Sequence, residues 1–271
     1  MSATWCLNAT PASRSFSTAS VSSLLDVASA APSAERLLLA IATLVPVAYL
    51  SCVRIERDLP VLVDGCSQRP HSRNVVAECF AIYRRSYFLS DAVMPLARRL
   101  SERPAGAPVA LRCRADELPV PGWRDDIYVR ERLADRFSLL YASPQGSVQA
   151  IHLYRDERQG AFQAQEIEQL LAFAPLLQQA HLASLSIVRR QREEDDPVLR
   201  ARQRLQAEAP QLSPRETEVV ARLACGWSAD GVAADLDVAP STVVTLRKRA
   251  YLKLAERGQP AQRIRLARWL A

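Results

Sequence analysis

Lysine is almost missing from this chain. Of its 35 basic residues only Lys248 and Lys253 are lysines, and both lie near the C-terminal end. A phosphate-binding P-loop needs a lysine directly after its glycines, and no lysine stands upstream of residue 248. The scarcity of lysine therefore excludes ATPases and helicases of the P-loop class.

A phosphate-accepting receiver domain is excluded by a related absence. The run from Leu59 to Gly65 resembles the segment around the phosphorylated aspartate of such domains, with Asp64 in its place. A receiver also needs an upstream acidic pair that binds magnesium and a downstream lysine, and the chain has neither. We therefore interpret Asp64-Gly65 as the turn of a β-hairpin.

The six cysteines show no metal-binding spacing. None belongs to a C-x-x-C motif, and no cluster of cysteine and histidine suggests zinc, so we expect no metal site. Unpaired thiols indicate a reducing compartment, and we expect a cytoplasmic protein. The cysteines are Cys6, Cys52, Cys66, Cys79, Cys113 and Cys225.

Long hydrophobic runs are also scarce. The longest candidate, from Leu37 to Leu50, is too short to span a bilayer and is interrupted by Pro46. The first residues lack the basic stretch and apolar core of a secretory signal. We therefore expect no membrane association.

No arrangement of side chains points to catalysis. Asp125, Asp126, Glu131 and Asp135 precede His152 without a nucleophile elbow or metal-ligand spacing. We expect that the protein is not an enzyme and uses no cofactor.

The chain does have an excess of positive charge at its C-terminal end. The net charge is +6 over 271 residues, and residues 212–271 hold ten Arg or Lys and six Asp or Glu, giving +4. Contact with phosphates requires such an excess. This end is therefore the candidate nucleic-acid-binding part of a chain long enough for two domains.

Helix-capping signals divide this basic end into short helices. Ser213 and Glu216 form a capping-box pattern, and Gly226 is suited to the left-handed conformation that ends a helix. Ser228 can cap a second helix, from about Ala229 to Leu236.

A third helix is predicted from Ser241 to Ala255. Its apolar residues at 243, 246, 250 and 254 are spaced three, four and four apart, which makes one buried stripe. Two short helices joined by a turn indicate a helix-turn-helix when the second helix exposes a polar and basic face. In this motif the second helix, the recognition helix, enters the major groove. The candidate DNA-binding residues are Ser241, Thr242, Val244, Thr245, Lys248, Arg249 and Lys253.

Residues 212–271 resemble the LuxR-type (GerE-like) helix-turn-helix domain. The resemblance implies a four-helix bundle with a fourth helix at about 261–270, and in this family that helix is often used for dimerisation. It also implies binding to double-stranded DNA and transcriptional regulation by a homodimer. The matching residues are Leu212-Ser213-Pro214-Arg215-Glu216, Glu218-Val219, Gly226, Ser228, Val232-Ala233, Leu236, Val238, Pro240, Thr242-Val243, Thr245, Arg247, Arg249, Tyr251, Lys253 and Leu254.

Three positions depart from the family pattern. Ala239 stands where a capping Ser or Thr is usual, so the recognition helix is expected to begin one or two residues later, at Ser241. Val244 replaces a common Lys or Arg, and Asp230-Gly231 replaces a Lys- or Glu-bearing pair. These departures leave affinity and operator sequence open.

The rest of the chain is predicted to contain a sensor domain. Residues 1–31, rich in Ser, Thr and Ala, are expected to form a disordered arm. Between residues 32 and 190 the expected order is helix, hairpin, two helices, strand, short helix, hairpin and long helix. The expected elements are a helix at 33–44, strands at 47–55 and 60–64, helices at 74–87 and 90–100, a strand at 109–114, a helix at 123–133, strands at 137–143 and 147–154, and a helix at 163–192.

This order resembles GAF- and PAS-type modules, which are α-β-α layers, and more loosely the autoinducer-binding domain of quorum-sensing LuxR proteins. We therefore expect an α+β sensor domain followed by the all-α four-helix domain. A small-molecule effector is expected to bind to the sensor domain. Asp91 is followed by Ala92 where the autoinducer family has proline, and the first Trp of that family's pocket set is missing. The candidate ligand-binding residues are Tyr83, Tyr87, Asp91, Trp123 and Tyr128.

One alternative to ligand sensing stays open. The sensor-like domain could serve only for dimerisation or protein interaction, with DNA binding under no ligand control. Residues 191–211, a charged run broken by Pro197, are expected to be a solvated linker.

Overall fold

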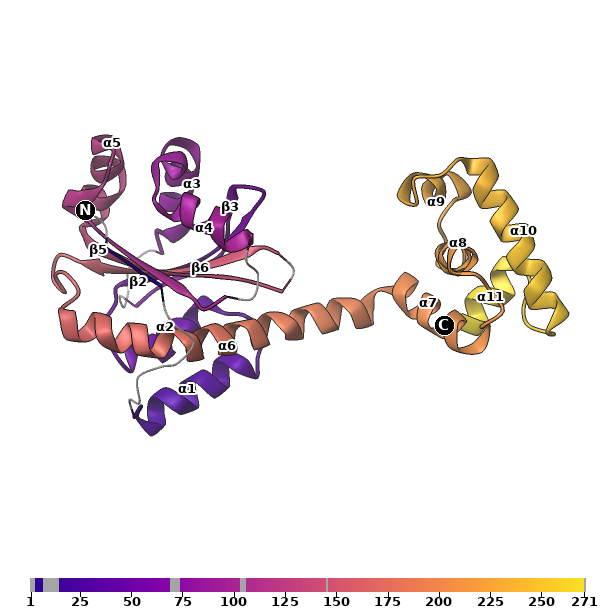
Figure 1. Ribbon diagram of the computed structural model, residues 1–271, viewed down its shortest axis with the longest axis horizontal. Coiled ribbons are helices and arrows are strands. Elements are labelled where there is room, and N and C mark those ends of the chain that lie inside the picture. Colours follow the sequence, from indigo (N-terminus) through magenta and orange to yellow (C-terminus); the bar gives the residue numbers. More distant parts are fainter. Residues whose placement is uncertain (1–2, 7–14, 69–73, 103–105, 145, 271) are drawn as a thin grey trace. The chain divides into compact units, whose positions relative to one another are not determined.

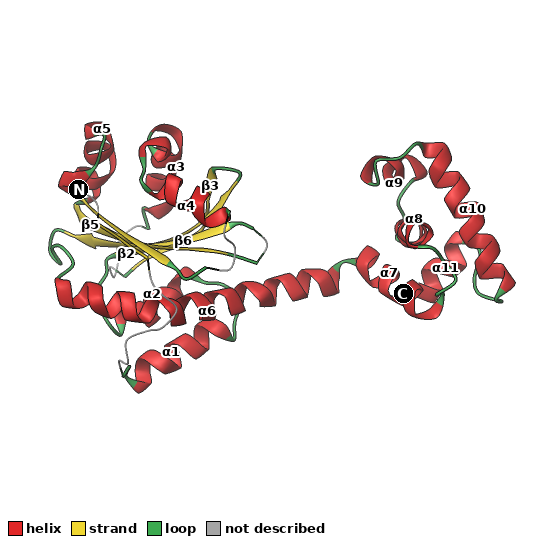
Figure 2. Ribbon diagram, viewed as in Figure 1, coloured by secondary structure: helices red, strands yellow, loops and turns green. Residues whose placement is uncertain are grey.

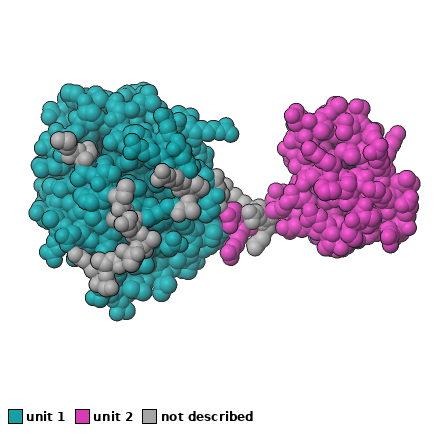
Figure 3. Space-filling view, viewed as in Figure 1, with its two compact units in different colours: residues 1–187 teal, residues 188–271 magenta. Residues whose placement is uncertain are grey.

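A computed structural model describes residues 3–6, 15–68, 74–102, 106–144 and 146–270. The chain divides into two compact units, residues 1–187 and residues 188–271, coloured separately in Figure 3. Each unit closes its own hydrophobic core, so each is described by itself.

The first unit is built on an antiparallel sheet. Within the described residues the sheet has six strands in the order β1-β4-β5-β6-β2-β3. Its central strands are buried on both faces, and their burial includes polar residues such as Arg136 and His152. The strands are β1 (Ala3–Cys6), β2 (Tyr49–Glu56), β3 (Leu59–Ser67), β4 (Val109–Arg114), β5 (Leu133–Ala142) and β6 (Val148–Asp156).

The first hairpin turns between the strands predicted at 47–55 and 60–64, and its second strand continues past Asp64 to Ser67. Arg57 and Asp58, between β2 and β3, both have positive φ, of 50° and 62°, as a tight two-residue hairpin requires. The interpretation of Asp64-Gly65 as a turn is wrong, because both residues lie inside β3 opposite Cys52 and Ser51. The Asp64 carboxylate instead accepts a 2.7 Å hydrogen bond from the backbone N–H of Ala34 at the start of a helix.

Helices cover both faces of the sheet (Figure 1 and Figure 2). One face carries α1 (Thr18–Ala28), α2 (Ala34–Ala42) and α6 (Ala164–Asp195). The other carries α3 (Val76–Ser86), α4 (Val93–Ser101) and the turn formed by α5 (Pro121–Trp123) and the π-helix η3 (Arg124–Val129). Single-turn helices η1 (Phe88–Ser90) and η2 (Ala115–Glu117) lie between them in the chain. The α-β-α layering expected from the sequence is confirmed.

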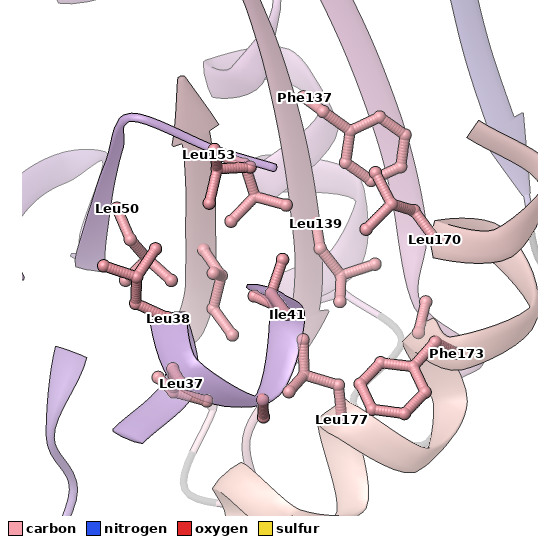
Figure 4. Close-up of a cluster of buried hydrophobic side chains, with 14 of the residues drawn as sticks. Leu37, Leu38, Ile41, Leu50, Phe137, Leu139, Leu153, Leu170, Phe173 and Leu177 are labelled. Atoms are coloured by element: carbon pink, nitrogen blue, oxygen red, sulfur yellow. The ribbon is translucent and has the colours of Figure 1, made fainter. Parts of the chain in front are cut away.

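The main core lies between the sheet and the face formed by α1, α2 and α6. Figure 4 shows Ile41 of α2 and Phe173 of α6 packed with Leu139 of β5. Successive β5 residues point to opposite faces. Phe137, Leu139 and Tyr141 therefore belong to this core, and the residues between them face α3 and α4.

Helix α6 is held to the sheet by its first half. Ile167, Leu170 and Phe173 are buried against the core. By length and composition alone, residues 164–191 could also cross a membrane, and 39% of the tested stretch is buried inside the protein. The core helix of a soluble protein passes the same test, so this helix is weak evidence for a membrane.

The expectation of a disordered N-terminal arm is wrong for residues 18–28. They form α1, in which Leu24 and Val27 are buried and Ser17 caps the helix. Residues 3–6 form the edge strand β1, which pairs with β4. Residues 1–2 and 7–14 of the predicted arm lie outside the described residues.

The second unit is all-α, and its predicted caps are confirmed. Ser213 and Glu216 form the capping box of α8, Gly226 has a φ of 95° after that helix, and Ser228 caps α9. The recognition helix begins at Pro240, one residue earlier than expected, and Ala239 provides no side-chain cap. The helices are α7 (Pro197–Glu208), α8 (Pro214–Ala224), α9 (Ala229–Asp235), α10 (Pro240–Glu256) and α11 (Arg263–Leu270).

The range expected to be a solvated linker contains a packed helix. Asp196 caps α7 by accepting hydrogen bonds from the N–H groups of Val198 and Leu199. Ala201 and Leu205 are buried in a cluster with residues of α8, α10 and α11. A four-residue spacing on a helix puts these two apolar side chains on one face, which is why α7 packs onto the helical core.

Candidate nucleic-acid interface and ligand pocket

Helix α10 is fixed to its unit by one apolar stripe. Val243, Ala250 and Leu254 are fully buried, and Leu246 is partly buried between them, as the spacing predicted. Val243 packs in a cluster with residues of α8 and α9, whereas Ala250 and Leu254 pack with α7, α8 and α11. This packing determines which side of α10 faces solvent.

The solvent side carries most of the candidate DNA-binding residues, and we call it the outward face of α10. It consists of Ser241, Thr242, Thr245, Lys248 and Arg249, all of them exposed. The Thr245 hydroxyl donates a 2.9 Å hydrogen bond to the Ser241 carbonyl. Within the part of the chain that the structure describes, Lys248 and Arg249 have no ion-pair partner. Val244 is half-buried at the edge of this face.

Lys253 has a different environment from Lys248. Its ammonium donates to Glu216 Oε2 at 2.7 Å, and the same oxygen accepts the Ser213 N–H that completes the α8 capping box. Burial alone would raise the pKa of Glu216, but the hydrogen bonds from Lys253 and Ser213 lower it below its usual 4.5. Lys253 thus ties α10 to the start of α8.

Ion pairs also fasten the helices around α8. Arg222 pairs with Glu218 of the same helix and with Asp235 of α9. Arg202 of α7 pairs with the same Glu218 at 2.9 Å. These partners hold Arg222 and Arg202 within the unit, whereas Lys248 and Arg249 have no ion-pair partner among the described residues.

The first unit contains a cavity between its sheet and the turn formed by α3, α5 and η3, and we call it the inner cavity. Its volume is about 60 Å³. One water-sized group occupies about 10–15 Å³ on this scale, so the cavity holds about four to six such groups. Its lining residues are Tyr49, Ser51, Val53, Val75, Val76, Cys79, Phe80, Tyr83, Trp123, Ile127, Tyr128, Leu133, Arg136, His152 and Tyr154.

One wall of the inner cavity is formed by Arg136, which belongs to a buried ion pair. Arg136 and Asp91 are each 2% exposed and form two parallel hydrogen bonds of 2.8 Å. The guanidinium of Arg136 also lies 5.3 Å from the centre of the Trp123 ring. Burial would raise the pKa of Asp91, but Arg136 lowers it below its usual range, so the ion pair is charged.

An outer pocket of about 260 Å³ lies on the other side of this wall. It shares only Trp123 and Arg136 with the inner cavity and is lined in addition by Asp91, Leu89 and Glu117. Arg136 and Trp123 therefore separate the two spaces.

The five candidate ligand-binding residues do not all reach the inner cavity. Tyr83, Trp123 and Tyr128 line it, whereas Asp91 stands behind Arg136. Tyr87 stacks on the outer side of Trp123, and its hydroxyl donates to Asp126.

Sequence reasoning missed part of the lining. The strand predicted at 137–143 contains Phe137, Leu139 and Tyr141, whose side chains face the opposite core. Arg136, one residue earlier, faces the cavity. An arginine inside an apolar strand was the signal that could have identified it.

His152 also lines the inner cavity. Its Nδ1 is 2.8 Å from the Ser138 hydroxyl, and burial together with the charge of Arg136 lowers its pKa to about 3. The imidazole is therefore neutral at physiological pH. Within the described residues, no group of three or more His, Cys, Asp and Glu side chains could hold a metal ion.

Comparison with known proteins matches the second unit most closely. The family model described as "Bacterial regulatory proteins, luxR family" matches residues 210–261. The "Probable transcriptional regulatory protein NarL" of Mycobacterium tuberculosis is 57% identical over 53 residues, which are 20% of this chain. The chain spans about a quarter of that relative, 24% of its length.

Two solved structures of bacterial proteins are similar to this chain over longer stretches. An N-acylhomoserine lactone dependent LuxR family transcription factor, CepR2 of Burkholderia cenocepacia, has a TM-score of 0.44 at 21% identity, over 62% of this chain and 96% of that one. Escherichia coli SdiA has a TM-score of 0.42 at 16% identity, over 92% of this chain and 94% of that one. Similarity at this level assigns neither a ligand nor a partner to this chain.

The family match coincides with the unit whose capping box, buried stripe and outward-facing recognition helix are described above. The resemblance inferred from the sequence is thereby confirmed. Residues 210–261 of this chain form a domain of the luxR family of bacterial regulatory proteins.

Proposed function

We propose that the protein is a DNA-binding transcriptional regulator that reads the major groove with the outward face of α10. The observation that carries the proposal is the exposed row of hydroxyl and cationic side chains on that face. Hydroxyls and cations are suited to base edges and phosphates. Lys248 and Arg249 are available because neither forms an ion pair within the described residues, and the family match to residues 210–261 supports the same role.

Two lysine substitutions test this assignment. Duplexes selected from a random pool by the wild-type protein supply the operator, and affinity is then titrated at several fixed salt concentrations. Lys248→Ala should lower specific affinity by about 1–3 kcal/mol if the side chain reads a guanine. If Lys248 contacts a phosphate instead, the loss should be similar for all sequences and the salt dependence should fall by about one ion.

Lys253→Ala is the matched comparison on the same helix. Because Lys253 is held by Glu216, we expect a smaller loss of DNA affinity from this change. Equal affinity of wild type and Lys248→Ala for the selected operator at every salt concentration would contradict the proposed reading face.

We further propose that a small molecule in the inner cavity modulates DNA binding, and that the protein is a cytoplasmic homodimer. Support for an effector comes from the mostly apolar cavity with a few convergent polar groups. A change in operator affinity after denaturation and refolding without cell metabolites tests it. Unchanged affinity favours the alternative, a dimerisation or protein-interaction module without ligand control.

Dimerisation is expected because a two-fold operator needs a two-fold protein. The exposed Ile264 of α11 and Leu176 of α6 are available for contacts between copies. Light scattering of the free protein and of its operator complex measures the number of copies. A single copy in both samples would refute the homodimer.

A further inference from the structure

We propose that Val244 of α10 contacts the C5-methyl group of a thymine in the major groove, so that the operator requires a thymine at one position. The proposal rests on the proposed DNA-binding function and adds a specificity-determining residue at the edge of the outward face of α10. It is carried by the position of Val244 on the helix and by the chemistry of its side chain.

Val244 lies in the part of α10 that is suited to contact with bases. It belongs to the first third of the helix Pro240–Glu256. The N-terminal residues of a recognition helix are the ones that contact base edges. Lys248 follows four residues later, so the two side chains lie one turn apart on the same side of the helix. A docking that brings Lys248 into the groove therefore brings Val244 into it as well.

The Val244 side chain does not belong to the core of its unit. Within the described residues, the two apolar clusters of this unit include Val243 and Leu246 but not Val244. Val244 is half-buried, whereas Val243 is completely buried. Val244 is therefore an apolar side chain, partly in solvent, that is available for a contact outside the protein.

Thymine is the base that matches an aliphatic side chain. Its C5-methyl is the apolar group that the base pairs present in the major groove, whereas guanine, adenine and cytosine present hydrogen-bond donors and acceptors there. Valine can neither donate nor accept a hydrogen bond. Packing Val244 on one of these three bases would remove water from a polar group without replacing the lost hydrogen bond, which is unfavourable.

The neighbouring Thr245 has the same preference. Its hydroxyl donates to the Ser241 carbonyl at 2.9 Å, so the hydroxyl hydrogen is already in use. The side chains at positions 244 and 245 therefore offer methyl groups and no free hydrogen-bond donor. This pair suits thymine better than guanine, whose major-groove edge presents two acceptors.

Replacing thymine by uracil tests the contact directly, because it removes the methyl group and keeps the base pair. Duplexes selected from a random pool by the wild-type chain are made again with deoxyuridine at one thymine at a time, and affinity is titrated at fixed salt. At one position this change should weaken binding about three- to fivefold, as expected for the loss of one buried methyl group. In Val244→Ala the same change should weaken binding by about twofold or less.

Two further variants serve as controls on the same helix. Leu252→Ala removes an exposed apolar side chain two turns after Val244, and it should keep the full effect of uracil. Thr245→Ser removes the neighbouring methyl group, and it should also keep the effect at the thymine assigned to Val244. The two controls separate a contact by Val244 from a general effect of apolar side chains on α10.

A second selection, with Val244→Arg, tests the contact by changing its specificity. Arginine binds guanine O6 and N7 through two hydrogen bonds. The duplexes selected by this variant should therefore hold guanine where those of the wild type hold the uracil-sensitive thymine. Retention of thymine at that position would overturn the proposal.

Equal affinity for thymine and uracil at every position would also overturn the proposed contact, even with a tightly bound operator. An effect of uracil that persists in Val244→Ala would overturn the assignment to Val244. If the wild-type chain enriches no duplex from the pool, the proposed DNA-binding function itself fails. The two kinds of failure are therefore distinguishable.

Discussion

At the scale of single residues, Lys253 ties α10 to the start of α8, whereas Lys248 on the outward face has no ion-pair partner among the described residues. Lys253→Ala leaves the buried Glu216 carboxylate without its ammonium partner. Because Lys253 is partly exposed, we expect a loss of about 1–2 kcal/mol in the unfolding free energy. Chemical denaturation measures the change, and Lys248→Ala, which removes an unpaired lysine, should stay within about 0.5 kcal/mol of wild type.

The buried His152 leads to a second prediction at this scale, which concerns the loss of folding stability at low pH. The unfolded chain binds its proton near the ordinary value of 6.5, whereas folding lowers the pKa of His152 to about 3. The contribution of the neutral His152 to the unfolding free energy is therefore fully present above pH 6.5 and is lost as the pH falls from 6.5 towards 3. Buried His181, with its pKa lowered to about 4, acts in the same direction.

Each of these histidines should contribute a slope of up to about 1.4 kcal/mol per pH unit between pH 5 and 6. His152→Gln should remove about half of the slope that the two produce together. The measurement is the unfolding free energy of the first unit at several pH values. The same slope in wild type and His152→Gln would contradict a neutral buried His152.

At the scale of elements, local signals explain what the sequence could predict. The capping box of α8, the left-handed Gly226 and the spaced apolar residues of α10 act within a few residues, so they were identified correctly. Helix α1 was missed because it is held by Leu24 and Val27 contacts with distant parts of the chain. The Asp91–Arg136 ion pair joins residues 45 positions apart, and no local pattern indicates such a contact.

The recognition helix offers a prediction about capping. Ala239 has the extended backbone of an N-cap, with φ of −67° and ψ of 145°, but it has no side chain that can accept a hydrogen bond. Ala239→Ser should therefore raise the unfolding free energy by about 0.5–1 kcal/mol.

The reciprocal change, Ser213→Ala, removes the cap of α8 and should lower the unfolding free energy by about 1 kcal/mol. Both changes are measured by chemical denaturation. A destabilised Ala239→Ser variant would show that the turn before α10 excludes a capped start.

At the scale of the whole molecule, the two units should fold separately, and α7 should be needed by the second. A fragment of residues 196–271 contains the α7 side chains that complete the helical core, whereas residues 212–271 lack them. Burial of Leu205 alone contributes about 1.5–3 kcal/mol. We therefore expect the longer fragment to melt cooperatively and the shorter one to be less stable by at least about 2 kcal/mol.

Leu205→Ala in the longer fragment is the matched control, and it should cost about 2–5 kcal/mol. Circular dichroism melts of the three samples measure the effect. Equal stability of both fragments would place the domain boundary at residue 212, and α7 would then be only a connector.

Because Lys253 is paired with Glu216, one copy of the protein can read only the DNA that the outward face of α10 covers. The outward face of α10 runs from Ser241 to Arg249, about 12 Å along the helix axis. At about 3.4 Å per base pair, this length corresponds to about four base pairs. A given sequence of four base pairs recurs by chance every few hundred base pairs. This is far too often to distinguish one promoter from the competing sites of a genome. Selectivity must then come from two copies of the protein that bind two such half-sites at a fixed spacing. Inserting half a helical turn of DNA between the half-sites should therefore abolish tight binding.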